Sequence, residues 1–447
     1  MRIAMRYAVL VGLFLISSLV WAQAPENADP AKVGEDRMLA PPPVSGQAYA
    51  VALDSEEHAN SLHYGLTFST GYSDNVLGAV NGHSVSDVNY SIWPTIGLDA
   101  STTRLHWDLN YAPGFTFYQH TSGRNEADQS ASIGFQYRLS PHVTFSAQDN
   151  FQKSSSVFNQ PSIMGPVFGG GQGPNNSVVA PLADRLSNFG TVTITYQYAR
   201  NDMIGAGGSF YNLHYPDLTQ VTGLSDAASQ SGSGFYTHRF SASHYVGVSY
   251  AYQRLMSYPS GMDYRTLTHS VFLFYTVYPS RRVSMSFFGG PQFSDTVQPG
   301  IPSLHFPAFS SRAWNPQVGA SVNWQRRFVS TAFSYSHAVS SGGGLVGASR
   351  LDNATGGLRL QFTPSLTASL SGLYANNNVI GNSLGAYSGH TYSGSAALER
   401  RIGERVGVQI GYTRLHQNYQ VPVLAGTPDT NREFISLSYS LARPLGR

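Results

Sequence analysis

The chain has 447 residues, of which 12% are charged and 13% aromatic, and its formal net charge is +2. So small a net charge gives no argument for a nucleic-acid partner, and the absence of cysteine excludes disulfide frameworks, thiol nucleophiles, cysteine-bound zinc and a lipoprotein anchor. The low charge and the many tyrosines and glycines are typical of strands with one apolar and one polar side.

Residues 1–22 have the three-part layout of a secretory signal peptide. Arg2 and Arg6 precede an apolar run over residues 7–20, and small residues follow, which predicts cleavage after Ala22. The alternative is a transmembrane helix, which needs about 20 apolar residues, more than this run offers. No later stretch could span a membrane as a helix, and an exported chain that crosses a membrane without helices needs a closed barrel.

Residues 23–60 are rich in Ala, Pro, Asp and Glu and include three consecutive prolines, Pro41 to Pro43. This composition predicts a periplasmic, poorly ordered N-terminal linker. The alternative is a plug that enters the lumen of a barrel. The shortness of the segment and its few apolar residues make that the weaker interpretation.

From residue 62 to the C-terminus, apolar and polar residues alternate in short segments that are separated by turn residues. In residues 191–198, for example, Val192, Ile194, Tyr196 and Tyr198 fall on one side of a strand, and threonines and a glutamine fall on the other. The predicted strands are 62–73, 88–100, 104–118, 127–139, 142–153, 186–200, 203–215, 232–241, 244–258, 264–278, 282–296, 314–325, 328–340, 351–362, 366–376, 390–401, 405–417 and 432–442.

These segments predict an all-β protein with about 18 strands, within a range of 16–18. Short and long connections alternate along the chain, which is typical of a transmembrane barrel. We expect a single transmembrane antiparallel up-and-down barrel over residues 61–443, followed by a tail at 444–447. The apolar face would contact lipid, and the short turns would all lie at the periplasmic rim. A soluble β-sandwich or propeller is the alternative, but a propeller would repeat a motif every ~40–50 residues, and we find none.

The sequence predicts no catalytic, cofactor or metal site. There is no helix to hold a His-x-x-x-His pair and no His-x-His on a strand, although the chain contains 14 histidines. His83 and Ser84 are adjacent, as in a barrel-embedded lipid hydrolase, but they fall in a predicted loop with no visible partner. We therefore expect a protein that is not an enzyme.

Strand parity predicts polar residues that line the lumen. Their charges have both signs, which favours weak ion selectivity at most. The long loop 154–184 is the third long connection. Its position indicates a loop that folds inward and narrows the pore, and a mobile external lid is the equal alternative. The candidate lumen-lining residues are Asp108, Gln136, Arg138, Gln197, Arg359, Glu399 and Arg401, and the candidate constriction residues are Phe158, Phe168, Gly170 and Asn175.

The first predicted strand is rich in glycine and ends in Tyr72-x-Asp74-Asn75-Val76. It resembles the opening of the β-barrel porin family associated with exopolysaccharide export. The last strand is similar to the alternating signal that barrel-assembly machinery reads, but residues 443–447 follow it in place of a terminal aromatic residue.

The resemblance implies an outer-membrane channel for passive passage of small solutes or of a secreted exopolysaccharide. The expected partners are outer-membrane lipid and lipopolysaccharide, the assembly machinery and the transported solute or polysaccharide, with no nucleic acid. Two other classes stay open: a structural or adhesin-like barrel with a blocked lumen, and the lipid hydrolase.

Overall fold

The computed structural model describes residues 38, 60–77, 84–154, 177–178, 184–218, 224–259, 263–299, 308–380, 388–419 and 429–445. These residues form 18 strands and one short 3-10 helix, Ser122–Arg124. The strands are β1 (Ser61–Ser73), β2 (Asp87–Ser101), β3 (Leu105–Tyr118), β4 (Glu126–Arg138), β5 (Val143–Ser154), β6 (Arg185–Ala199), β7 (Asp202–His214), β8 (Asp226–Ser241), β9 (His244–Tyr258), β10 (Tyr264–Ser280), β11 (Val283–Gln298), β12 (Phe309–Arg326), β13 (Val329–Ser341), β14 (Ala348–Thr363), β15 (Leu366–Val379), β16 (Ser388–Ile402), β17 (Val406–Tyr419) and β18 (Asp429–Pro444).

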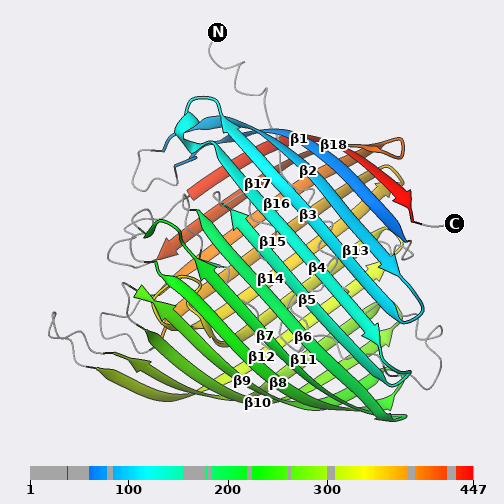
Figure 1. Ribbon diagram of the computed structural model, residues 1–447, viewed down its shortest axis with the longest axis vertical. Coiled ribbons are helices and arrows are strands. Elements are labelled where there is room, and N and C mark those ends of the chain that lie inside the picture. The colour runs from blue at the N-terminus through cyan, green and yellow to red at the C-terminus, as the bar shows by residue number, and fades with distance from the viewer. Residues whose placement is uncertain are drawn as a thin grey trace.

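All 18 strands belong to one antiparallel sheet in which each strand pairs with its neighbours in the sequence. The sheet closes on itself because β1 pairs with β18 as well as with β2. Figure 1 shows the result, a barrel of strongly tilted strands. The predicted barrel and the predicted number of strands are confirmed. In the described part of the chain, no helix is long and apolar enough to cross a membrane.

On most strands the side chains alternate between a more exposed apolar set and a less exposed, mainly polar set. On β18, Ile435, Leu437 and Tyr439 are 43–51% exposed, whereas Phe434 and Ser436 are 2% and 1% exposed. Successive side chains of a strand point to opposite faces, so the apolar set covers the outside of the barrel and the other set faces the lumen. An apolar outer surface of this kind is suited to contact with lipid.

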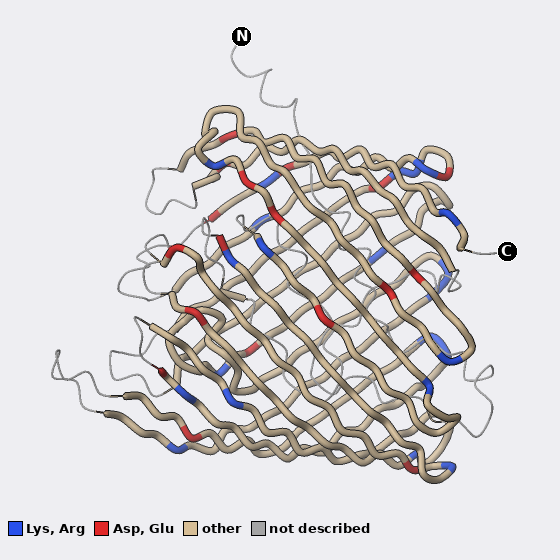
Figure 2. Tube along the Cα trace, in the orientation of Figure 1, with Lys and Arg blue, Asp and Glu red and all other residues tan. Residues whose placement is uncertain are grey.

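Short connections lie at one end of the barrel and long connections lie at the other. Eight short connections, such as 200–201 between β6 and β7, form one end, which we call the short-turn rim. Nine longer connections form the other end, the long-loop rim. Both ends of the barrel chain lie at the short-turn rim, where the Leu445 N–H donates to the Asn60 carbonyl. Lys and Arg positions gather toward the rims (Figure 2).

Several strands begin or end beyond their predicted bounds at the long-loop rim. β12 begins at Phe309 rather than at 314, and β8 begins at Asp226 rather than at 232. The outward residues in these extensions include Arg312, Asp226 and Gln230, so the apolar alternation that marks a lipid-facing strand is missing there. The strands therefore continue past the apolar band into a polar layer.

Candidate functional site: the lumen and the hairpin that enters it

The seven predicted lumen-lining residues all lie on the lumen side of their strands, in two groups. Asp108, Gln136 and Arg138 belong to β3 and β4, and Arg359, Glu399 and Arg401 belong to β14 and β16. The strands β17, β18, β1 and β2 separate these groups by the shorter way round the wall. Gln197 on β6 stands apart, since it is buried and accepts a hydrogen bond from the Met38 N–H at 3.0 Å. Their part in ion selectivity stays a prediction.

Lumen-facing aromatic rings lie flat on the wall over glycines of the adjacent strand. A Cβ added to Gly205, Gly247 or Gly319 would overlap the ring of Phe235, Phe274 or Phe288, respectively. Glycine permits this close approach because it has no side chain. The rings therefore extend along the wall instead of projecting toward the barrel axis.

Near the long-loop rim the end of β13 separates from β12, while β14 stays paired with β15 as far as Ser349. β13 pairs with β12 only as far as His337, opposite Val318, whereas residues 338–341 stay paired with β14 alone. Gln292 on β11 replaces the missing neighbour: its Oε1 accepts from the Val339 N–H at 2.8 Å and its Nε2 donates to the Val339 carbonyl at 3.4 Å. The backbone of a buried strand edge is thus hydrogen-bonded by a side chain.

The tip of the hairpin formed by β13 and β14, residues 342–347, reaches strands on another side of the barrel. The Ser225 N–H donates to the Gly344 carbonyl at 2.7 Å, and the Gly347 N–H donates to Ser257 Oγ of β9 at 2.9 Å. Leu345 forms a β-bridge with Leu224 and is 1% exposed. Because β7–β9 and β13–β14 are separated by three or more strands, the tip can make these contacts only by crossing part of the lumen.

Glycine allows the tip to fold back on itself. Gly343, Gly344 and Gly347 have φ values of 65°, 108° and 96°. These left-handed conformations are open to glycine at little cost and are unfavourable for other residues. Tyr215, just beyond β7, packs against Gly344, and burial raises the pKa of its hydroxyl above the ordinary value.

A second inward contact comes from the predicted constriction loop. Thr391 Oγ1 donates to the Ser177 carbonyl, and Asn377 Nδ2 donates to Ser177 Oγ, each at 2.8 Å. Val178 is fully buried in a cluster with Leu345, Tyr211 and Tyr419. The loop connects β5 and β6, which lie across the barrel from β15–β17, so residues 177–178 lie within the lumen. The four residues predicted to form the constriction, Phe158, Phe168, Gly170 and Asn175, lie outside the described residues.

The inserted hairpin was not predicted, because residues 341–350 lie between two predicted strands and have the composition of an ordinary loop. The signal that could have found it is the run Gly342-Gly343-Gly344 followed by Leu345 and Val346. An apolar pair directly after a glycine turn is unexpected in a loop that projects into water. It indicates a loop that packs against something.

The two inward elements cover one part of the lumen wall and leave another part open. On β9 every lumen-facing side chain is buried, and on β10 every lumen-facing side chain from Tyr264 to Thr276 is buried. On β5 the lumen-facing residues from Thr144 to Gln152 are only half-buried, and on β15 Ser369 and Ser371 are exposed, whereas Asn377 and Val379 nearer the long-loop rim are buried. Half-buried or exposed polar side chains thus line the lumen along β4 and β5 and along the short-turn half of β14–β16.

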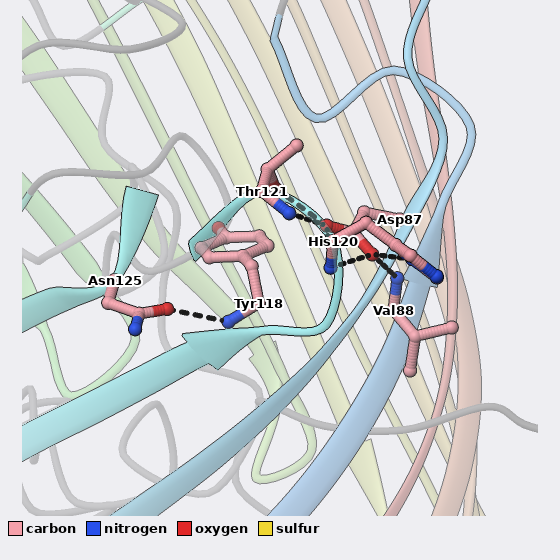
Figure 3. Close-up of polar contacts among 6 residues, drawn as sticks. All are labelled: Asp87, Val88, Tyr118, His120, Thr121 and Asn125. Carbon is pink, nitrogen blue, oxygen red and sulfur yellow. Dashed lines mark hydrogen bonds and ion pairs between the residues drawn. The ribbon is translucent and has the colours of Figure 1, made fainter. Parts of the chain in front are cut away.

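At the long-loop rim, Asp87 fixes the loop between β3 and β4 beside this polar surface. Its carboxylate accepts hydrogen bonds from the Thr121 N–H at 2.8 Å, from Thr121 Oγ1 at 2.6 Å and from the Val88 N–H at 2.7 Å, and its Oδ1 lies 3.0 Å from His120 Nδ1. Figure 3 shows these contacts together with the bond from the Tyr118 N–H to Asn125. A carboxylate that is both buried and hydrogen-bonded by backbone N–H groups is a strong anchor for a loop.

The structure bears only in part on the residues considered for catalysis and metal binding. Ser84 is exposed, and its neighbour His83 lies outside the described residues. Within the described part of the chain there is no group of three or more His, Cys, Asp or Glu side chains that could hold a metal ion.

No protein-family model and no curated protein matches this sequence. Among solved structures, Pseudomonas aeruginosa OccK2 (OpdF) matches at 11% identity over 86% of this chain and 98% of that chain, with a TM-score of 0.40. Pseudomonas aeruginosa OpdK, solved with vanillate, matches at 10% identity over 87% of this chain and 100% of that chain, with a TM-score of 0.40.

The ferric citrate transporter FecA matches at 11% identity over 84% of this chain and 61% of that chain, with a TM-score of 0.38. At these identities and TM-scores the likeness carries no argument about function. None of the three is described as an exopolysaccharide exporter, so the resemblance of the first strand gains no support from them.

Proposed function

We propose that this protein is an outer-membrane channel for the passive passage of small polar solutes. The observation that carries the proposal is the polar, half-buried lumen surface along β4 and β5, which stays accessible although a hairpin fills another part of the lumen. A closed barrel is the one β-structure that satisfies its backbone within lipid. Barrels of 16–18 strands are wide enough to leave an aqueous channel.

The outer surface supports a membrane location with the long loops outside the cell. Beyond the apolar band, outward side chains near the long-loop rim form ion pairs, such as Arg312 with Asp295 at 3.3 Å and Arg414 with Asp429 at 2.8 Å. Such groups suit the polar layer of lipopolysaccharide head groups. The predicted signal peptide and the alternating residues of β18 support export through the periplasm and recognition by barrel-assembly machinery.

Small solutes fit the lumen better than a polysaccharide does. The hairpin tip and residues 177–178 cross the lumen, which limits the width of anything that passes. The lumen-facing rings of Phe272, Phe274 and Phe288 on β10 and β11 are buried and offer no stacking surface to a sugar chain. Lumen charges of both signs, such as Asp108 and Arg359, favour weak selectivity.

Single-channel recording in planar lipid bilayers tests the proposal. We expect discrete open steps from the purified, folded barrel, and larger steps when residues 342–347 are replaced by Asn-Gly. Ser341 and Ala348 are directly paired, so a two-residue hairpin turn can join them. Folding is monitored separately by the heat-dependent mobility of the barrel on gels. A barrel that is folded but electrically silent in both forms would instead indicate a structural or adhesin-like protein.

A further inference from the structure

One strand of the barrel wall, β12, has a free edge near the long-loop rim. β12 pairs with β11 from its first residue onward, but with β13 only from Val318 onward. The end of β13 has turned into the lumen, where Val339 lies in one buried cluster with Leu255 of β9. Residues 309–317 therefore have a paired neighbouring strand on one side only.

The unpaired backbone groups of this edge belong to alternate residues. On the other edge of β12, the Gln325 N–H donates to the Arg282 carbonyl at the start of β11. Successive residues of an antiparallel strand direct their N–H and C=O groups to opposite sides. Ser310, Arg312 and Trp314 lie an odd number of positions from Gln325, so they direct their backbone groups away from β11. Among the described residues, none forms a backbone hydrogen bond with these groups.

The side chains along this edge are those of a strand edge in a polar layer. Ser310, Arg312, Trp314 and Pro316 are all exposed, and Trp314 is 71% exposed. By the same alternation the nitrogen of Pro316 lies on the free side, where the missing N–H interrupts no pairing. Arg312 forms its ion pair with Asp295 above the apolar band. Water can therefore bond to the edge when no partner is present.

We infer that residues 309–317 of β12 are a docking site for an extended peptide segment of another protein, which adds a strand to the barrel sheet. Unpaired N–H and C=O groups along a strand edge are a template for such addition. Here the groups of Ser310, Arg312 and Trp314 and the Pro316 carbonyl repeat every two residues, about 6.8 Å. An extended peptide backbone has the same repeat, and the place that β13 leaves beside β12 receives it.

This site goes beyond the proposed channel function. Recognition rests on the main chain of the peptide, and the exposed side chains of Arg312 and Trp314 contact alternate side chains of the added strand. Only the location of the site outside the cell rests on the orientation proposed for the barrel.

Peptide binding tests the inference. The probe is a fluorescent synthetic peptide of about ten residues in which threonine and valine, both strong strand formers, alternate. The control peptide has the same sequence with consecutive N-methylated residues, which cannot form a ladder. We expect the unmodified peptide to bind the purified, folded barrel and to slow hydrogen exchange at the Arg312 and Trp314 amides, but not at Ala313. The N-methylated peptide should bind about tenfold more weakly or not at all.

A pair of variants separates the backbone from the side chain at the centre of the edge. Trp314→Pro removes an N–H on the free side and leaves the pairing with β11 intact, as Pro316 already does. Trp314→Ala is the matched control, because it removes the indole ring and keeps the N–H. We expect about tenfold weaker peptide binding in Trp314→Pro and a smaller change in Trp314→Ala.

Absence of binding to the purified barrel overturns the inference, since Arg312 and Pro316 would then protect the edge against strand addition. Equal binding of the two peptides or equal loss in the two variants also overturns it. On cells that carry the barrel, binding to neither intact nor permeabilised cells overturns it as well, because lipopolysaccharide then covers the edge.

Binding to permeabilised cells alone supports the docking site and contradicts the proposed orientation. None of these measurements depends on conductance, so the docking site can stand even if the proposed channel function fails.

Discussion

Replacement of Gln292 by alanine should release the inserted hairpin from the wall. The Gln292 amide is the contact that substitutes for a neighbouring strand at Val339, where β13 has left β12. Both residues are almost completely buried. Removal of the amide leaves a backbone N–H and a backbone C=O in a site that water does not reach while the hairpin is docked. Undocking lets both groups bond to water, so the substitution favours the undocked hairpin.

The size of the effect follows from these two bonds. An unsatisfied buried polar group costs about 1–3 kcal/mol, and the bond at 3.4 Å counts toward the low end of that range. The docked hairpin should therefore lose about 2–4 kcal/mol relative to the undocked one. Since 1.4 kcal/mol corresponds to a factor of ten, the undocked population should rise by about 30- to 700-fold.

Hydrogen exchange measured by mass spectrometry on the folded barrel reports this population. We expect the amides of residues 338–347 to exchange about 30- to 700-fold faster in Gln292→Ala, because they exchange through local opening. Gln317→Ala is the matched control: Gln317 is a buried, lumen-facing glutamine on the adjacent strand β12, and its Oε1 has no hydrogen-bond partner within the described structure. Equal protection of the hairpin in Gln292→Ala and in the unmodified protein would refute the anchoring role.

Three further predictions concern the tip, the lumen charges and the lipid face. Gly344→Val should cost about 1–3 kcal/mol of tip docking, because its φ of 108° is strained for valine, and protease cleavage within residues 342–347 should become faster. Arg359→Glu combined with Arg401→Glu should shift the reversal potential in a salt gradient toward cation preference, and an unchanged potential would remove these residues from the ion path. Leu437→Arg, in the middle of β18, should destabilise the barrel in lipid by roughly 2–4 kcal/mol in urea unfolding, whereas Ser438→Arg on the lumen side should have a much smaller effect.

The barrel could be predicted from the sequence because its outer wall obeys a local rule. Each lipid-facing strand has to alternate apolar and polar residues, so Val192, Ile194 and Tyr196 reveal both the strand and the side that faces outward. The same parity placed Asp108 and Arg359 on the lumen side. The rule fails at the long-loop rim, where Arg312 and Asp295 face a polar layer and the outward residues no longer need to be apolar.

The contents of the lumen could not be predicted in the same way, because they depend on contacts between residues far apart in the sequence. Nothing in the sequence near Val339 indicates that the Gln292 side chain hydrogen-bonds to its backbone. Likewise, nothing near Met38 indicates that its N–H donates to Gln197, which lies 159 positions later in the sequence. A segment that packs inside a polar lumen needs only occasional apolar residues, so its composition is that of a loop. Composition therefore separates the wall from the loops, but it does not separate the loops that enter the lumen from those that leave it.

The inward elements show how a channel of this kind could restrict the size of its solutes without a separate plug domain. The hairpin is continuous with two wall strands, so its base is fixed by the barrel's own hydrogen bonds, and only the tip depends on Leu345, Ser225 and Ser257. Weakening of the tip contacts would widen the pore while the wall stays intact, since no tip residue pairs with β12 or β15. In the proposed channel, pore width and barrel stability should therefore be separable, and substitutions in the tip should change conductance without changing the unfolding midpoint of the barrel.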